Sequence, residues 1–71
     1  MYLVWAEYNT KKPASTALQE GIQAYIDRFH IQPRVVVVNS DNDVQSDEVE
    51  IYRLQRVAKT DYQIGTERPK Y

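Results

Sequence analysis

The segment 13–38 restricts this chain to an α/β arrangement, because an amphipathic helix is followed there by a wholly apolar strand. Apolar residues recur at spacings of three and four, which places them on one helix face. They are Ala14, Ala17, Leu18, Ile22, Tyr25, Ile26 and Phe29. Pro13 suits the first helical turn, where its missing N–H would have no partner. The helix must end before Pro33, and the four valines 35–38 then form a strand that is apolar on both sides.

Three positions of this helix leave questions open. Thr16 with Gln19 is a weaker capping-box pattern that would start the helix later. Gly21 costs about 1 kcal/mol relative to alanine in a helix, and either a close approach to a sheet or plain tolerance explains it. His30 falls at the C-terminal end, where a protonated imidazole interacts favourably with the helix dipole, so we expect it to cap the helix.

Residues 1–8 predict the strand that precedes the helix, and this strand is apolar on both sides. Alternation places one set of side chains on one side of the strand and a second set on the other. The first set is Tyr2, Val4, Ala6 and Tyr8, and the second is Met1, Leu3, Trp5 and Glu7. Strands of this kind belong in sheets covered on both faces. The sequence offers one clear helix, so we expect the uncovered face, with either Leu3 and Trp5 or the tyrosine row, to bind another copy of the chain.

Residues 48–57 have two interpretations. As a strand they alternate Val49 and Ile51 against Tyr52 and Leu54. As a helix over 47–59 they place acids first and bases last, which matches the helix dipole. β-branched and aromatic content favours the strand. Residues 60–66 predict a final strand that forms a hairpin with it. The expected fold is a two-layer α/β (α+β) domain of β-α-β-β-β order with one helix on a short mixed sheet; the alternative is β-α-β-α-β.

Length and composition exclude several classes of protein. A chain of 71 residues is one domain, which we place at 1–66, with a polar C-terminal tail at 67–71. It has no cysteine and one histidine, which excludes disulfides, thiolate metal sites and a His/Cys zinc site. No apolar run is long enough to cross a membrane. We expect a cytoplasmic protein that contacts no membrane and needs no cofactor.

Neither of the two candidate chemical sites has the pattern of an enzyme. Five acids lie within ten residues and could attract a hard cation, but they lack the EF-hand spacing and suit a solvated turn. They are Asp41, Asp43, Asp47, Glu48 and Glu50. His30 has no recognisable nucleophile beside it, because the serines lack the flanking glycines of a nucleophile elbow. We therefore predict no metal site, no catalytic residue and no enzyme activity.

The C-terminal third carries the pattern that favours nucleic-acid binding. Cations neutralise phosphates, and tyrosine rings stack on unpaired bases. The cations are Arg53, Arg56, Lys59, Arg68 and Lys70, and the interleaved rings are Tyr52, Tyr62 and Tyr71. The net charge of −1 and the neighbouring acids oppose this interpretation. A nucleic-acid-binding accessory protein is therefore the alternative function.

The preferred function is a small non-catalytic interaction module that forms a homodimer or binds another protein. Large amphipathic rings dominate the binding energy of many interfaces, although they also fill the cores of small domains. The predicted interface residues are Tyr2, Leu3, Trp5, Tyr52 and Tyr62. On the first strand, the interface role belongs to the side that the helix leaves uncovered. The sequence identifies neither the partner nor a pathway.

Overall fold

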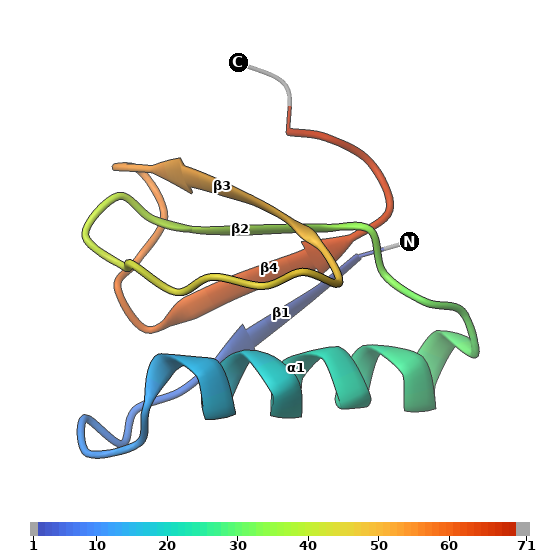
Figure 1. Ribbon diagram of the computed structural model, residues 1–71, viewed down its shortest axis with the longest axis horizontal. Coiled ribbons are helices and arrows are strands. Elements are labelled where there is room, and N and C mark those ends of the chain that lie inside the picture. The colour runs from blue at the N-terminus through green and yellow to red at the C-terminus, as the bar shows by residue number, and fades with distance from the viewer. Residues whose placement is uncertain (1, 70–71) are drawn as a thin grey trace.

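The computed structural model describes residues 2–69, in which one helix packs on a four-stranded mixed sheet (Figure 1). The elements are β1 (Tyr2–Ala6), α1 (Ala14–Phe29), β2 (Val35–Asn39), β3 (Glu50–Leu54) and β4 (Asp61–Gly65). The α+β class and the β-α-β-β-β order expected from the sequence are confirmed. Residues 50–54 form a strand, so the alternative with a second helix is wrong, and α1 is the only helix of the described residues.

The ends of α1 follow from two residues with restricted or unusual backbone geometry. Pro13 is the N-cap, with φ −59° and ψ 144°, and no side chain caps the first turn. The helix therefore starts at Ala14, and the later start suggested by Thr16 is not used. His30 is the C-cap: it adopts a left-handed conformation (φ 60°), and its N–H donates to the carbonyl of Ile26 at 2.7 Å. The expected capping position of His30 is confirmed.

The strand order corrects the predicted hairpin. The sheet runs β1-β4-β2-β3, so β4 lies between β1 and β2, antiparallel to both, while β3 pairs parallel to β2. β3 and β4 are not neighbours. The side chains explain this order, because Tyr62 and Ile64 of β4 are buried and suit a central strand, whereas Glu50 and Arg53 of β3 suit an edge.

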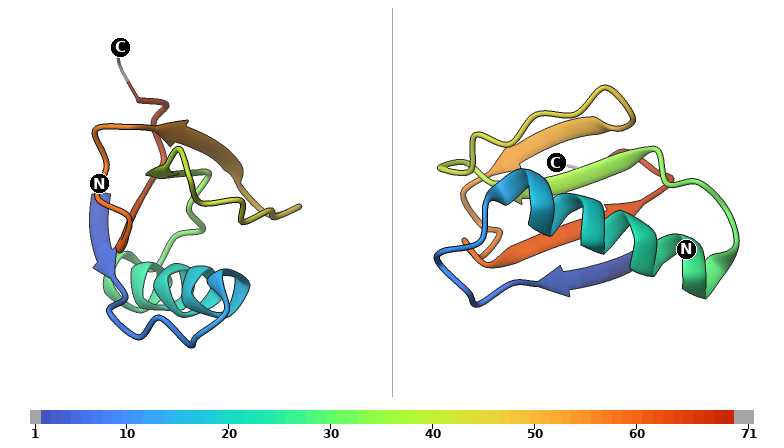
Figure 2. Two further views of the ribbon diagram at one scale, coloured as in Figure 1. Left: turned by 90° about the vertical axis from the view of Figure 1, so that its left-hand side faces the viewer. Right: turned by 60° about the horizontal axis from the view of Figure 1, so that its bottom comes forward.

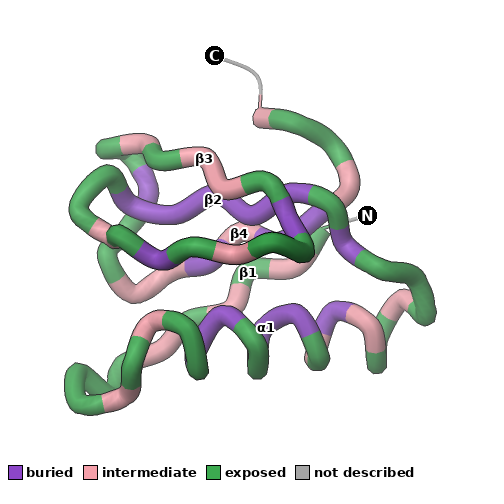
Figure 3. The backbone as a smooth tube through the Cα atoms, viewed as in Figure 1, coloured by how far each residue is buried: buried purple, intermediate pink, exposed green. Residues whose placement is uncertain are grey.

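The main core lies between α1 and the sheet. Leu18, Ile22 and Tyr25 of the helix pack against Val36 and Ile64 of the central strands. The segment 40–49, which connects β2 to β3, runs back along the sheet in Figure 1 and adds Val44 and Val49 to the same core. Figure 3 shows the result, with β2 buried along its length and α1 buried on one side.

Gly21 is the point of close approach between α1 and the sheet. A Cβ at this position would lie 2.8 Å from Cδ1 of Ile64 and 3.0 Å from Cγ and Cδ1 of Trp5. Distances this short leave no room for a methyl group unless these side chains move. Of the two explanations left open by the sequence, the structure supports close packing.

We expect Gly21→Ala to lower the free energy of unfolding by about 1 kcal/mol. Overpacking a core costs about 1–3 kcal/mol, which exceeds the gain of about 1 kcal/mol that alanine brings as a helix former. Urea denaturation followed by circular dichroism measures the difference. The matched control compares Gln19→Gly with Gln19→Ala, because Gln19 is exposed on α1 and has no core contact. There, alanine should be the more stable by about 1 kcal/mol. A Gly21→Ala protein more stable than the wild type would show that the glycine is merely tolerated.

Candidate functional site

The sheet has one face that α1 does not cover, and it is the strongest candidate for a functional surface (Figure 1). Residues paired across neighbouring strands point to the same side of a sheet. Tyr2 and Val35 both pair with Gly65, while Val4 and Val37 both pair with Gln63. We call this surface the open face; it consists of Tyr2, Val4, Ala6, Val35, Val37, Asn39, Glu50, Tyr52, Leu54, Asp61, Gln63 and Gly65.

Other parts of the chain cover the open face at β2 but not at β1. Val35 and Val37 are buried, because Val57 from the β3–β4 connection packs on them together with Tyr52 and Leu54. At β1 nothing within residues 2–69 gives such cover: Tyr2 is 61% exposed and Val4 45%. Tyr8, two residues beyond β1, is 76% exposed. The solvent-accessible apolar surface is therefore concentrated along the first strand and its extension.

A cavity of about 280 Å³ lies between the open face and the C-terminal tail. Its floor is apolar and is made by Tyr2, Val35 and Val37, and Gly65 contributes no side chain. Residues 66–69 leave the sheet at the end of β4 and form the other wall. The volume is just below the range of about 300–1,000 Å³ that is usual for small-molecule sites. It is large enough to receive a side chain from a partner.

The tail is held to β3 by a small polar cluster. Arg68 lies 3.4 Å from Oε1 of Glu50, and the Tyr52 hydroxyl donates to Oε2 of Glu50 at 2.8 Å. The hydrogen bond from Tyr52 and then that from Arg68 lower the pKa of Glu50 below its usual value. Arg68, which lines the cavity, is therefore paired with an acid of β3.

The structure divides the predicted interface residues between two faces. Tyr2 and Tyr52 lie on the open face. Leu3, Trp5 and Tyr62 point towards α1, where Tyr62 is buried in the core and the other two are half-buried beside it. Of the two rows on β1, the one with Tyr2 is uncovered. Val4 belongs to the same row, and its exposure follows from strand alternation, but it was missing from the predicted interface.

Among the described bases of the C-terminal third, Arg53 and Lys59 contact the loop after β2, whereas Arg68 lies at the tail. Arg53 points to the helix side, where its guanidinium donates to the backbone carbonyls of Asn42 and Val44. Lys59 pairs with Asp41 at 3.2 Å in the loops. Arg68 pairs with a glutamate at the open face, and Lys70 and Tyr71 lie outside the described residues.

The acidic segment 40–49 is held by hydrogen bonds between its backbone N–H groups and nearby side chains. The side chains of Asn39, Asn42 and Ser46 each accept a hydrogen bond from an N–H two residues ahead, at 2.8–3.0 Å. Asn39 also donates to the carbonyl of Val57 at 2.7 Å, which fixes the connection that crosses the open face. Within residues 2–69, no three histidine, aspartate or glutamate side chains are grouped around a possible metal position.

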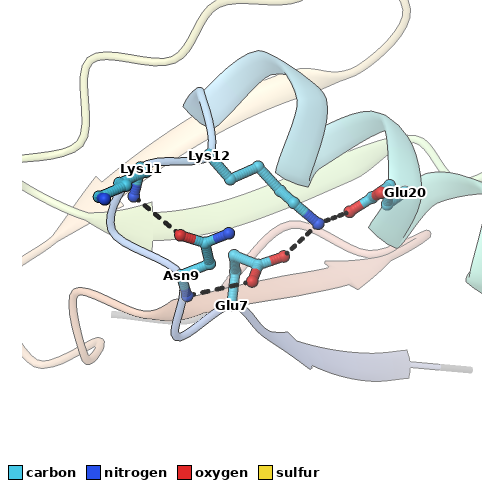
Figure 4. Close-up of polar contacts among 5 residues, drawn as sticks. All are labelled: Glu7, Asn9, Lys11, Lys12 and Glu20. Carbon is cyan, nitrogen blue, oxygen red and sulfur yellow. Dashed lines mark hydrogen bonds and ion pairs between the residues drawn. The ribbon is translucent and has the colours of Figure 1, made fainter.

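A second hollow borders the outer side of β1, and we call it the β1 groove. It has a volume of about 510 Å³ and is lined by Trp5, Glu7, Lys12, Glu20, Gln23, Ala24 and Asp27. Lys12 crosses it, with its Nζ 3.1 Å from Glu7 and 2.7 Å from Glu20 (Figure 4). The hydrogen bond that Lys12 donates lowers the pKa of Glu7, and the hydrogen bonds that Lys12 donates to Glu20 and Glu7 raise its own pKa.

Comparisons with protein-family models, with curated proteins and with solved structures found no match for this chain. Within the described part of the chain, α1 is too short and too polar to cross a lipid bilayer.

We expect Lys12→Met to raise the pKa of Glu7 towards its usual value, because the hydrogen bond from Lys12 is the largest cause of the lowering. NMR titration of the Glu7 carboxyl carbon measures the change. A carboxyl with a lowered folded pKa stabilises the protein above its unfolded pKa, and this contribution is lost as pH falls through the folded pKa. The part of the stability difference that comes from the Lys12–Glu7 pair should therefore vanish in acid.

The matched control is Lys11→Met, since the Lys11 side chain has no ion pair within residues 2–69 and its backbone bond to Asn9 remains. An unchanged Glu7 titration in Lys12→Met would contradict the assigned cause.

Proposed function

We propose that this chain is a small, non-catalytic interaction module that self-associates through the open face. The observation that carries the proposal is the exposure of Tyr2 and Val4 on a face whose neighbouring valines are buried. Burying apolar surface is favourable by about 25 cal/mol per Å², so a partner that covers Tyr2 and Val4 gains free energy of binding. Tyr52 and the cavity beneath the tail extend the same surface.

A second copy of the chain is the partner that this surface fits best. In a twofold dimer each patch meets itself, so an unpaired charge near the axis would oppose its own copy. The exposed residues at β1 are uncharged, and Gln63 beside them is neutral. Glu50 and Arg68 are already paired. Tyr2, Val4 and Gln63 therefore meet their copies without like charges, while Asp61 opposite Ala6 and Glu67 at the cavity place acids at the margin of the face.

The size of the open face sets the expected affinity of self-association. Four strands about 4.8 Å apart, each of five residues at about 3.3 Å, give a face of roughly 19 by 17 Å. This is small beside the roughly 800 Å² of accessible surface that each partner commonly contributes to a stable interface. We therefore expect a weak, concentration-dependent dimer.

Two further expectations accompany this proposal. A cytoplasmic location, expected from the cysteine-free composition, is part of it. Nucleic-acid binding by the C-terminal bases stays a prediction, and the pairing of Arg53, Lys59 and Arg68 with groups of the chain itself gives it no support.

We expect Val4→Asp to weaken self-association at least tenfold, because it places two like charges in the dimer interface. Light scattering over a concentration range, in moderate and high salt, measures the association. The control is Ile31→Asp, since Ile31 is similarly exposed, at 38%, but lies outside the sheet. Tyr2→Ser should weaken the dimer without adding charge, and circular dichroism checks that each variant folds. A wild-type monomer at every concentration would overturn the proposal.

A further inference from the structure

β1 is an edge strand with none of the usual protection. Within residues 2–69 it pairs only with β4, and its other side faces outwards (Figure 2). An edge strand presents unpaired N–H and C=O groups, which proteins commonly guard with charges, proline or a bulge. The sequence Tyr-Leu-Val-Trp-Ala of β1 has neither a charge nor a proline. The opposite edge, β3, carries Glu50 and Arg53.

The helix side of this edge is also incomplete. Leu3 and Trp5 point to α1 yet remain only half-buried, since no strand flanks them on the outside. The β1 groove is the space that such a strand would cover. Side chains of a strand alternate between its faces, so an added strand would direct every second side chain into this groove.

The lining of the β1 groove determines which side chains fit. Trp5 supplies an apolar surface, and the charged groups are three acids and one base: Glu7, Glu20, Asp27 and Lys12. Lys12 pairs with both glutamates. Asp27 accepts a hydrogen bond from Gln23 at 2.9 Å, but no cation of residues 2–69 pairs with it. The groove therefore has an excess of negative charge beside an aromatic ring.

We propose that β1 binds an extended peptide by strand addition, and that the peptide carries lysine or arginine at every second position. The main chain of the peptide would pair with the free edge of β1, as in other complexes formed by β-augmentation. Its long aliphatic stems would lie on Trp5, and its cations would reach Glu20 and Asp27. The side chains between them would extend the apolar row of Tyr2 and Val4.

A second copy of β1 does not suit this edge. Twofold pairing of two β1 strands would bring the acidic flanks of both helices, with Glu20 and Asp27, to the same boundary. β1 itself carries no cation to offset them. The β1 edge is therefore a site separate from the open face, and its occupant has a different chemistry.

The test measures binding of an end-capped peptide (Lys-Val)₄ to the full chain by two-dimensional NMR. We expect shifts centred on β1 and α1, and slower hydrogen exchange at the β1 amides that do not pair with β4. The acidic peptide (Glu-Val)₄ should not bind, because it meets like charge. A (Lys-Val)₄ analogue with a central proline should bind at least tenfold more weakly, because it lacks a strand hydrogen bond.

Asp27→Lys should weaken binding of (Lys-Val)₄ at least tenfold, while Asp43→Lys, a matched reversal of an exposed loop acid, should have little effect. Equal binding of the acidic peptide, or shifts confined to the open face, would overturn the strand-addition site. So would the absence of binding. Asp27→Lys should leave self-association unchanged and Val4→Asp should retain peptide binding, so failure of one proposal is distinguishable from failure of the other.

Discussion

The rest of this structure depends on burying β2 on both faces with only one helix available. All five residues of β2 are buried, as four consecutive valines require. On one side α1 and the segment 40–49 provide the cover. On the other side the chain crosses from β3 to β4 and places Val57 on Val35 and Val37, while the tail lies over the remainder. This cover ends before β1, which explains why the exposed apolar residues gather there.

The predictable parts are those that depend on local periodicity. The spacing of apolar residues identified α1, and Pro13 and His30 marked its ends to within one residue. The valine run identified β2, and the β-branched and aromatic residues correctly favoured a strand at 50–54. Each of these features is a property of a short window, in which the side chains alone decide between a helical and an extended backbone.

Strand order could not be read in the same way, because it depends on pairings between distant segments. Proximity in sequence favoured a hairpin of β3 and β4, whereas the fold inserts β4 between β1 and β2. The decisive difference is burial: the inward row of β4, with Tyr62 and Ile64, needs neighbours on both sides, and Glu50 and Arg53 of β3 need solvent or loop carbonyls. The direction of Arg53 could not be read for a related reason, because strand alternation and a local loop turn it towards the helix side.

The sequence does not determine which side of β1 faces α1, because both rows of its side chains are apolar. A slip of one residue would exchange the rows, and hydrophobicity alone does not penalise it strongly. The contact at Gly21 determines which of the two rows faces α1. It is the one position of α1 without a side chain, and the indole of Trp5 fits against it at a distance that a Cβ would forbid. Trp5 on the helix side places Tyr2 and Val4 on the open face and leaves the β1 groove beside the indole. One packing contact thus determines both candidate surfaces.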